Sequence, residues 1–347
     1  MIWMTWRQFR PAAISAGAAL IALATAVAAT RPTLLSLYTS AGLPACHTAC
    51  ATDAQKFLSS VQFNYTEYIR FACIGIMYLV PAIIGLFWGA PLIARELDSG
   101  TFRLAWSQSV TRARWATVKL GLIGAAAILT AGLMSLLVGW WSSPLYQAAN
   151  QAGPNILSIS RLSGTLFSTT GIVPLGYAAF AFALGAAVGL LLRRTLPAMA
   201  VTVAVFVAIQ VLVPMLVRPH LIPPVQTTQA PSTAQIGGVD AIGQGVFVSV
   251  LGINGQRGAW ILGNRVVDAA GQTLTTLPGA CVHFLQNGNS SGFLSCLTRD
   301  GIKFAVSYQP ASRYWELQSA ETGMYLVLAA GLGGLCYWAV RRRQRAA

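Results

Sequence analysis

Side chains that could act as catalysts or metal ligands are scarce in this chain of 347 residues, which has three histidines, six cysteines and nine acidic residues. The most concentrated group is "CHTAC" (46–50), where a histidine lies between two thiols. Its spacing matches no usual zinc pattern, and no second ligand cluster accompanies it. A redox motif would have the spacing CxxC rather than CxxxC. We therefore expect no metal site and favour a structural disulfide.

An enzymatic site would have to be built from residues that are far apart in the sequence. The candidates are His220, His283, Asp240, Asp268 and Asp300. They show no spacing typical of a catalytic motif. The chain also lacks a GxxxxGK[ST] segment, so it has no P-loop with which to bind ATP. We expect a chain that is not catalytic and binds no cofactor, and that depends on a partner protein if ATP drives its activity.

The composition is that of a membrane protein. Hydrophobic residues make up 55% of the chain and charged residues only 9%, whereas soluble domains are about one quarter charged. With long apolar runs, this indicates a polytopic membrane protein. The net charge of +14 would suggest nucleic acid in a soluble protein. Here most arginines lie at the ends of apolar runs, so they indicate topology and we expect no nucleic-acid partner.

Six apolar runs are long enough to cross about 30 Å of hydrocarbon. They are 11–30, 71–93, 119–141, 170–192, 196–217 and 322–340. The first run ends in small residues that could mimic a signal-peptide cleavage site, but it exceeds a typical signal core and a consistent topology needs it. The sequence therefore predicts an all-α polytopic protein with six transmembrane helices. The N-terminal "MIWMTWRQFR" suits an amphipathic helix at the membrane surface.

The basic residues in short segments set the predicted orientation. They are Arg7, Arg10, Arg95, Arg103, Arg112, Arg114, Lys119, Arg193, Arg194 and the arginines of "RRRQR" (341–345). With six spans they all fall on one side, which the positive-inside rule makes cytoplasmic. We expect a multi-pass protein of the plasma membrane with both termini in the cytoplasm.

Three segments then lie outside: 31–70, 142–169 and 218–321. The last has about 100 residues, enough for a small domain. Its short apolar runs are separated by turn signals, which predicts a β-rich or mixed external domain between helices 5 and 6. The expected organisation is helices 1–5 in 1–217, including a cytoplasmic segment 94–118, then the domain 218–321, then helix 6 and a basic tail in 322–347.

The cysteines divide between these compartments. Four lie in the outside segments: Cys46, Cys50, Cys281 and Cys296. An oxidising exterior favours disulfides between them. Three pairings are possible from sequence, and the most local one joins the first two and the last two.

The apolar runs contain no Asp, Glu, Lys or His in their interiors, and Arg only at their edges. Ion-coupled transporters usually place such groups near the middle of the membrane, so their absence counts against secondary transport. Polar residues within the runs suit interhelical packing, or alternatively the lining of a path for a hydrophobic or amphipathic compound. The small residues Gly121, Gly124, Gly185 and Gly189 are expected to allow close helix contact.

The connection between the second and third runs concentrates the scarce charge. Its sequence is "ARELDSGTFRLAWSQSVTRARW" (94–115), and Glu96 and Asp98 are the only acidic residues between Glu67 and Asp240. A basic topology loop explains the arginines, but acidic residues contribute little to topology. The acids therefore indicate a partner, or a pair between Glu96 and a nearby arginine.

Residues 87–120 resemble the stretch between the second and third spans of ABC-2-type transporter permeases, in which a Glu followed by "GT" and a basic segment recurs. Two further segments, 184–207 and 308–328, resemble the actinobacterial branch of these permeases. The resemblance implies a permease subunit without its own ATPase, which pairs with a second permease chain and docks separate cytoplasmic ATP-binding-cassette subunits that bind ATP and Mg. A homodimer is favoured over a heterodimer.

The resemblance also implies that the connection couples the permease to the ATPase. The expected coupling residues are Glu96, Asp98, Gly100, Thr101, Phe102, Arg103, Trp106, Arg112 and Lys119. The expected function is export of a hydrophobic or amphipathic compound. The alternative is a membrane signalling or assembly protein whose external domain binds a ligand or partner.

Overall fold

The structure is a computed structural model that describes residues 2–46, 50–98, 112–152, 161–232, 236–242, 245–250, 253, 256 and 258–342. Several residues named above lie outside this described part of the chain. They are His47, Gly100, Thr101, Phe102, Arg103 and Trp106.

In the part of the chain that the structure describes, six helical segments are long and apolar enough to cross a membrane, and each overlaps its predicted run. They are built from α1 (Ile2–Ser40), α3 (Thr66–Ile83) with η2 (Ile84–Gly89) and α4 (Ala90–Asp98), α6 (Arg112–Ala152), α8 (Val173–Leu192), α9 (Thr195–Leu212) with η3 (Val213–Val217) and η4 (Arg218–His220), and α12 (Tyr314–Arg342). The prediction of six helices that could span a membrane is therefore confirmed.

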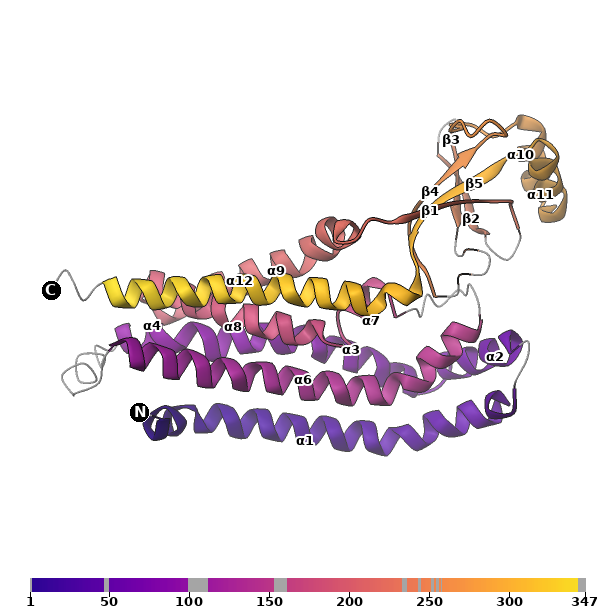
Figure 1. The fold of residues 1–347 in the computed structure, drawn as a ribbon. Coiled ribbons are helices and arrows are strands. Elements are labelled where there is room, and N and C mark those ends of the chain that lie inside the picture. The colour runs from indigo at the N-terminus through magenta and orange to yellow at the C-terminus, as the bar shows by residue number, and fades with distance from the viewer. Residues whose placement is uncertain are drawn as a thin grey trace.

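The spans lie side by side as a bundle, with both chain ends at one end and the strands at the other (Figure 1). We call these the basic end and the domain end. The helix α8 is the central one, because 78% of its apolar window is buried, against 11% for α1 and for the segment that contains α9. This helix is apolar on all sides and rich in alanine and glycine, as a fully surrounded helix must be.

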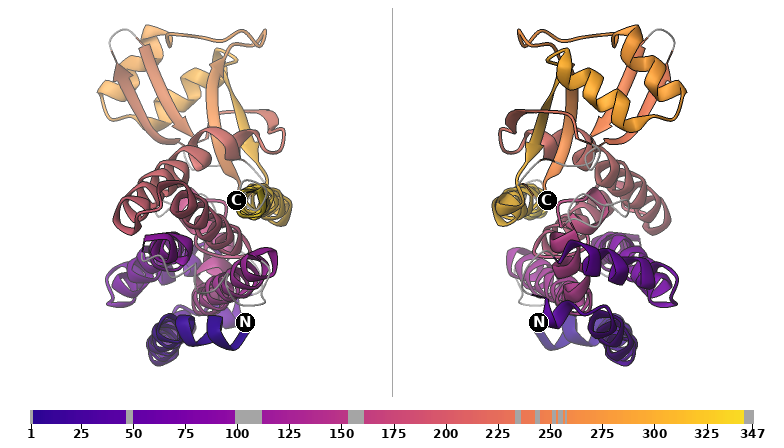
Figure 2. Two further views of the ribbon diagram at one scale, coloured as in Figure 1. Left: turned by 90° about the vertical axis from the view of Figure 1, so that its left-hand side faces the viewer. Right: turned by 90° about the vertical axis from the view of Figure 1, so that its right-hand side faces the viewer.

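The expected N-terminal interfacial helix is the first part of the continuous helix α1. Seen from the basic end, the first turns of α1 lie crosswise to the rest of that helix, at the edge of the bundle (Figure 2). Pro11 lies inside this helix. A proline removes one backbone hydrogen bond and clashes with the preceding turn, which kinks a helix.

Several helices continue beyond the apolar runs that predicted them. The helix α6 extends to Ala152 and α1 to Ser40, and α2 (Ala51–Gln62) and α7 (Gly164–Phe167) add helical turns at the domain end. A short helix η1 (Leu43–Ala45) follows α1. The loops 31–70 and 142–169 are therefore largely helical where the structure describes them.

Strands and short helices lie between the last two spans, and we call this region the domain. Its strands are β1 (Val225–Gln229), β2 (Ile236–Ile242), β3 (Gly245–Val250), β4 (Trp260–Val267) and β5 (Lys303–Gln309), and its helices are α10 (Gly279–Gln286), α11 (Ser290–Arg299) and η6 (Ala311–Arg313). One antiparallel sheet has the order β1-β5-β4, and β2 and β3 form a separate antiparallel pair.

The core of this domain follows from alternation along β5. Phe304, Val306 and Tyr308 are buried at every second position, as one face of a strand requires. They pack in one cluster with Phe293 and Leu297 of α11. The sequence-based boundaries at 217/218 and 321/322 need correction, because both fall inside continuous helical segments that connect this domain to the bundle.

Candidate functional site

The strongest polar feature of the bundle is a buried ion pair between the two spans that carry the domain. Arg218, at the end of the span containing α9, donates from Nε to Glu321 Oε2 at 2.7 Å and from Nη2 to Oε1 at 3.0 Å. The two side chains are 1% and 0% exposed. This bidentate geometry is the strongest form of the arginine–carboxylate contact.

Hydroxyl groups complete the environment of the pair. Tyr177 of α8 donates to Glu321 Oε1 at 2.7 Å, and Arg218 Nη2 lies 2.7 Å from Ser168 Oγ and 3.1 Å from Tyr177 Oη. The guanidinium carbon also lies 4.5 Å from the centre of the Phe167 ring. Burying two charges costs several kcal/mol per ion unless further hydrogen bonds satisfy them. Here such bonds are present.

One helical turn before Glu321, Gln318 holds the start of α8. Its Oε1 accepts from the backbone N–H groups of Ile172 and Val173 at 2.9 and 3.0 Å. Its Nε2 donates to the carbonyl oxygens of Phe167 and Thr170 at 2.9 and 3.1 Å. Gln318 thus satisfies the orphan N–H groups that every helix start leaves, and it fixes α12 against the turn before α8.

The residues Arg218, Glu321, Gln318, Tyr177 and Ser168 are called the buried network below. Its charges and its amide are hydrogen-bonded to other groups of the chain. What it does is fix the ends of the α9 and α12 spans to each other and to α8, directly beneath the domain.

The other end of α8 is joined to α4 and η2 by direct backbone contact. A Cβ placed at Gly189 would lie 2.4 Å from the carbonyl oxygen of Ala90, and one at Gly185 would lie 2.4 Å from that of Gly85. Only glycine permits this approach. The expected close contact is confirmed at Gly185 and Gly189. At Gly121 the expectation is wrong, because a Cβ there would meet nothing within 4 Å.

The segment predicted to couple to a partner begins at α4 and ends in α6. Glu96 lies in α4 and Arg112 is the first residue of α6. Asp98, the last residue of α4, accepts a hydrogen bond from Thr195 Oγ1 at 3.4 Å. Lys119 is only 6% exposed, and its Nζ lies 4.9 Å from the centre of the Trp115 ring. The structure therefore places both borders of the segment at the basic end.

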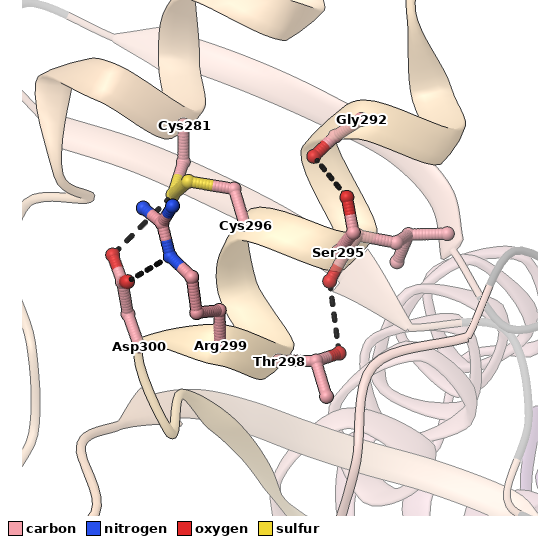
Figure 3. Close-up of a disulfide and its surroundings, with 8 residues drawn as sticks. Cys281, Gly292, Ser295, Cys296, Thr298, Arg299 and Asp300 are labelled. Atoms are coloured by element: carbon pink, nitrogen blue, oxygen red, sulfur yellow. Dashed lines mark hydrogen bonds and ion pairs between the residues drawn. A yellow bond between two sulfur atoms is a disulfide. The ribbon is translucent and has the colours of Figure 1, made fainter.

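The most local disulfide pairing is confirmed, with bonds Cys46–Cys50 and Cys281–Cys296. The second bond joins α10 to α11, beside the ion pair of Arg299 Nε with Asp300 Oδ1 at 3.3 Å (Figure 3). The ligand atoms of Cys281, Cys296 and Asp300 lie within 4.8 Å of one another. Because the two sulfurs are bonded to each other, neither is a thiolate that could bind a metal.

A family described as "ABC-2 membrane transporter related" matches residues 17–218, which is more than half of the chain. The chain belongs to this family. No curated protein and no solved structure matches it.

The matched region of this ABC-2-type permease ends at Arg218, so the buried network crosses its border. Arg218, Tyr177 and Ser168 lie inside the matched region, while Gln318 and Glu321 lie beyond it. Gln318 and Glu321 of α12 therefore hydrogen-bond to residues of the matched region, close to the point where the domain joins the bundle.

Sequence reasoning missed this network. The apolar runs ended one residue before Arg218 and began one residue after Glu321, so both residues were assigned to the external segment. The sequence does contain one indication of this pair. A single arginine and a single glutamate directly flank the two apolar runs that border the domain.

Proposed function

We propose that this chain is the membrane-spanning subunit of an ATP-binding-cassette exporter, and that a separate cytoplasmic ATPase drives it. The observation that carries the proposal is membership of the ABC-2-related family, whose matched region includes the whole segment 94–118. In this proposal ATP and Mg bind to the partner, and the chain itself is not catalytic. The cargo is a hydrophobic or amphipathic compound.

The orientation follows from charge and cysteine chemistry. The basic end lies in the cytoplasm, because the chain ends and the turn between α8 and α9 carry arginines there. The domain end then lies outside. Both disulfides support this, since one follows α1 at that end and the other lies in the domain (Figure 1), and disulfides persist in oxidising compartments.

The ATPase docks on the connection between α4 and α6. Packing supports this location, because α4 contacts α8 through backbone at Gly189 and cannot slide independently. A force applied at the connection is therefore carried into the central helix. Two such chains pair, as a homodimer in the simplest case, with the cargo path between them and the two domains above its exit.

The test is purification of the full chain together with a P-loop ATPase, followed by measurement of ATP hydrolysis by the complex in vesicles. The double variant Glu96→Ala with Phe102→Ala is expected to weaken assembly or to uncouple hydrolysis from the permease. The matched control is Glu316→Ala, which removes an exposed acid of α12 near the domain end.

The proposal fails if no ATPase accompanies the chain and hydrolysis is unaffected by its presence. The coupling assignment alone fails if the double variant assembles and stimulates hydrolysis as the unmodified chain does. Tight, specific binding of a ligand by the domain without any ATPase partner would support a signalling or assembly role instead.

A further inference from the structure

The sheet β1-β5-β4 of the domain has one covered side and one open side. Phe304, Val306 and Tyr308 of β5 pack with α11 in the core of the domain, and α10 and α11 lie in front of the strands in the right-hand view of Figure 2. Successive side chains of a strand point to opposite faces. Ala305 and Ser307 therefore point to the other side of the sheet, where both are only half-buried.

A cavity of about 280 Å³ lies on this open side, and its volume is close to the lower end of small-molecule sites. We call it the sheet trough. The residues that line it are Gln226, Thr227, Thr228, Gly263, Asn264, Arg265, Ala305, Val306 and Ser307. Two cross-strand rows, each running from β1 through β5 to β4, form its floor: Gln226, Ser307 and Gly263, then Thr228, Ala305 and Arg265.

Arg265 gives the sheet trough its charge, because it is the one charged residue in the lining. It is exposed and has no hydrogen bond or ion pair with any residue that the structure describes. The acidic residues of the domain are elsewhere. Asp268 and Asp300 bond to Gln272 and Arg299, and Asp240 belongs to the separate pair β2-β3. The sheet trough therefore attracts an anion.

The rest of the lining offers hydrogen bonds rather than apolar contact. The amide of Gln226 and the hydroxyls of Thr228 and Ser307 form no hydrogen bond with another side chain in the described part of the domain. No aromatic side chain lines the sheet trough, so it has no ring on which a base or a sugar could stack. The ligand that fits is small, polar and anionic.

Gly263 is a second and independent indication of a ligand. It lies in the interior of β4, next to a shift in the pairing of β4 with β5 between Ile261 and Gly263. A Cβ placed at Gly263 would meet nothing within 4 Å, so packing within the chain does not require a glycine there. A glycine inside a strand weakens it and often marks the close approach of a ligand, and such irregular pairing is frequent next to binding sites.

The width of the sheet narrows the class of ligand. Adjacent strands are about 4.8 Å apart, so β1 and β4 lie about 10 Å from each other across β5. An inorganic phosphate bound to Arg265 would leave most of the sheet trough to water. A phosphate that carries a hydroxylated group extends across β5, where its hydroxyls meet Ser307 and Gln226. The planar arginine side chain matches phosphate oxygens in pairs.

We propose that the sheet trough binds a phosphate that carries a hydroxylated group, either as a soluble organic phosphate or as the headgroup of a lipid. Arg265 holds the phosphate, Gln226 and Ser307 bind the hydroxyls, and Gly263 leaves the space that the ligand fills. The site lies beyond the region that the family matches, and it does not depend on an ATPase partner.

The first test is calorimetric titration of the full chain in neutral detergent with glycerol 3-phosphate, with an apparent Kd as readout. Arg265→Gln is expected to weaken binding by about tenfold or more, because a hydrogen bond to a charged group is lost. Arg299→Gln is the matched control. It removes the same charge from the same domain on the covered side of the sheet, where the side chain is 76% exposed, and is expected to leave binding unchanged.

A second pair of variants fills the sheet trough and keeps every charge. Gly263→Ile places a side chain in the space for the ligand and is expected to abolish binding, while β-branched residues are well tolerated in strands. Gly279→Ile is the matched control, because a Cβ there also meets nothing within 4 Å and Gly279 does not line the sheet trough. This pair keeps the proposal testable if the Arg265 variant does not fold.

The lipid source is tested in nanodiscs of phosphatidylcholine that contain phosphatidylglycerol with a photo-reactive headgroup. Labelling of β1 and β5 that Gly263→Ile removes assigns the site to a lipid headgroup, whereas titration without labelling assigns it to a soluble organic phosphate. Three results would overturn the proposal: inorganic phosphate binds as tightly as glycerol 3-phosphate, Gly263→Ile binds it as the unmodified chain does, or neither probe binds at all.

Discussion

Breaking the pair of Arg218 and Glu321 tests whether the buried network holds the spans together. In the variant Glu321→Leu, the guanidinium of Arg218 loses its bidentate partner while it stays in a position that is 1% exposed. Removing one member of a buried ion pair costs about 3–5 kcal/mol, because it leaves an uncompensated charge. The variant Arg218→Met is expected to cost a similar amount, since it leaves the carboxylate of Glu321 buried.

The double variant shows how much of the destabilisation comes from the unpaired charge and how much from the hydrogen bonds around the ion pair. With Arg218→Met and Glu321→Leu together, no charge remains, and replacing a buried pair by apolar residues is often neutral or stabilising. The hydroxyls of Ser168 and Tyr177 lose Arg218, but they keep their contact at 3.3 Å with each other. We therefore expect the double variant to lose about 1–3 kcal/mol of stability, because the hydroxyl groups of Ser168 and Tyr177 have fewer hydrogen-bond partners.

The measurement is the free energy of unfolding in detergent for both single variants and the double variant, with Glu316→Leu as the matched control. Glu316 lies on the same helix but is exposed, so its removal is expected to change stability by about 0.5 kcal/mol or less. The reasoning is refuted if Glu321→Leu costs no more than this control. It is also refuted if the double variant costs the sum of the two single ones, because contacting residues must couple.

Three further perturbations test other parts of the fold. Gly189→Ala is expected to lower the free energy of unfolding by about 1–3 kcal/mol through overpacking against α4. Gly121→Ala is expected to change it little, because a Cβ there meets nothing within 4 Å. Equal unfolding midpoints for the two variants would contradict this. Cys281→Ser with Cys296→Ser opens a disulfide with a sequence separation of 15 and is expected to cost the domain about 3 kcal/mol, measured as faster limited proteolysis. Gln318→Leu leaves two backbone N–H groups without their acceptor and is expected to cost about 2–4 kcal/mol, read from the unfolding midpoint.

The spans could be predicted from sequence because the membrane imposes a length. A helix needs about 20 apolar residues to cross the hydrocarbon, so six runs directly predicted six spans. The disulfide pairing was also accessible, since Cys46 and Cys50 are too close in sequence for a distant partner to be favoured. In the domain, turn signals indicated short elements, but they did not indicate that β5 would lie between β1 and β4.

The buried network could not be predicted in the same way. Arg218 and Glu321 are 103 residues apart, and no local pattern states which side chains meet across a bundle. Apolar runs also underestimate helix length at their ends. There a helix such as α12 continues through polar residues, because neighbouring helices rather than lipid satisfy those side chains.

The helix α8 connects the features found at the two ends of the bundle. Near its start, Tyr177 bonds to Glu321, and Gln318 holds the N–H groups at its first turn. Near its end, Gly185 and Gly189 leave no space between its backbone and that of η2 and α4. Packed interfaces of this kind do not deform continuously. If a partner drives the chain at the connection after α4, as proposed above, a displacement of α4 is expected to move α8 as a body. The buried network is then expected to pass that movement to the two helices that carry the domain.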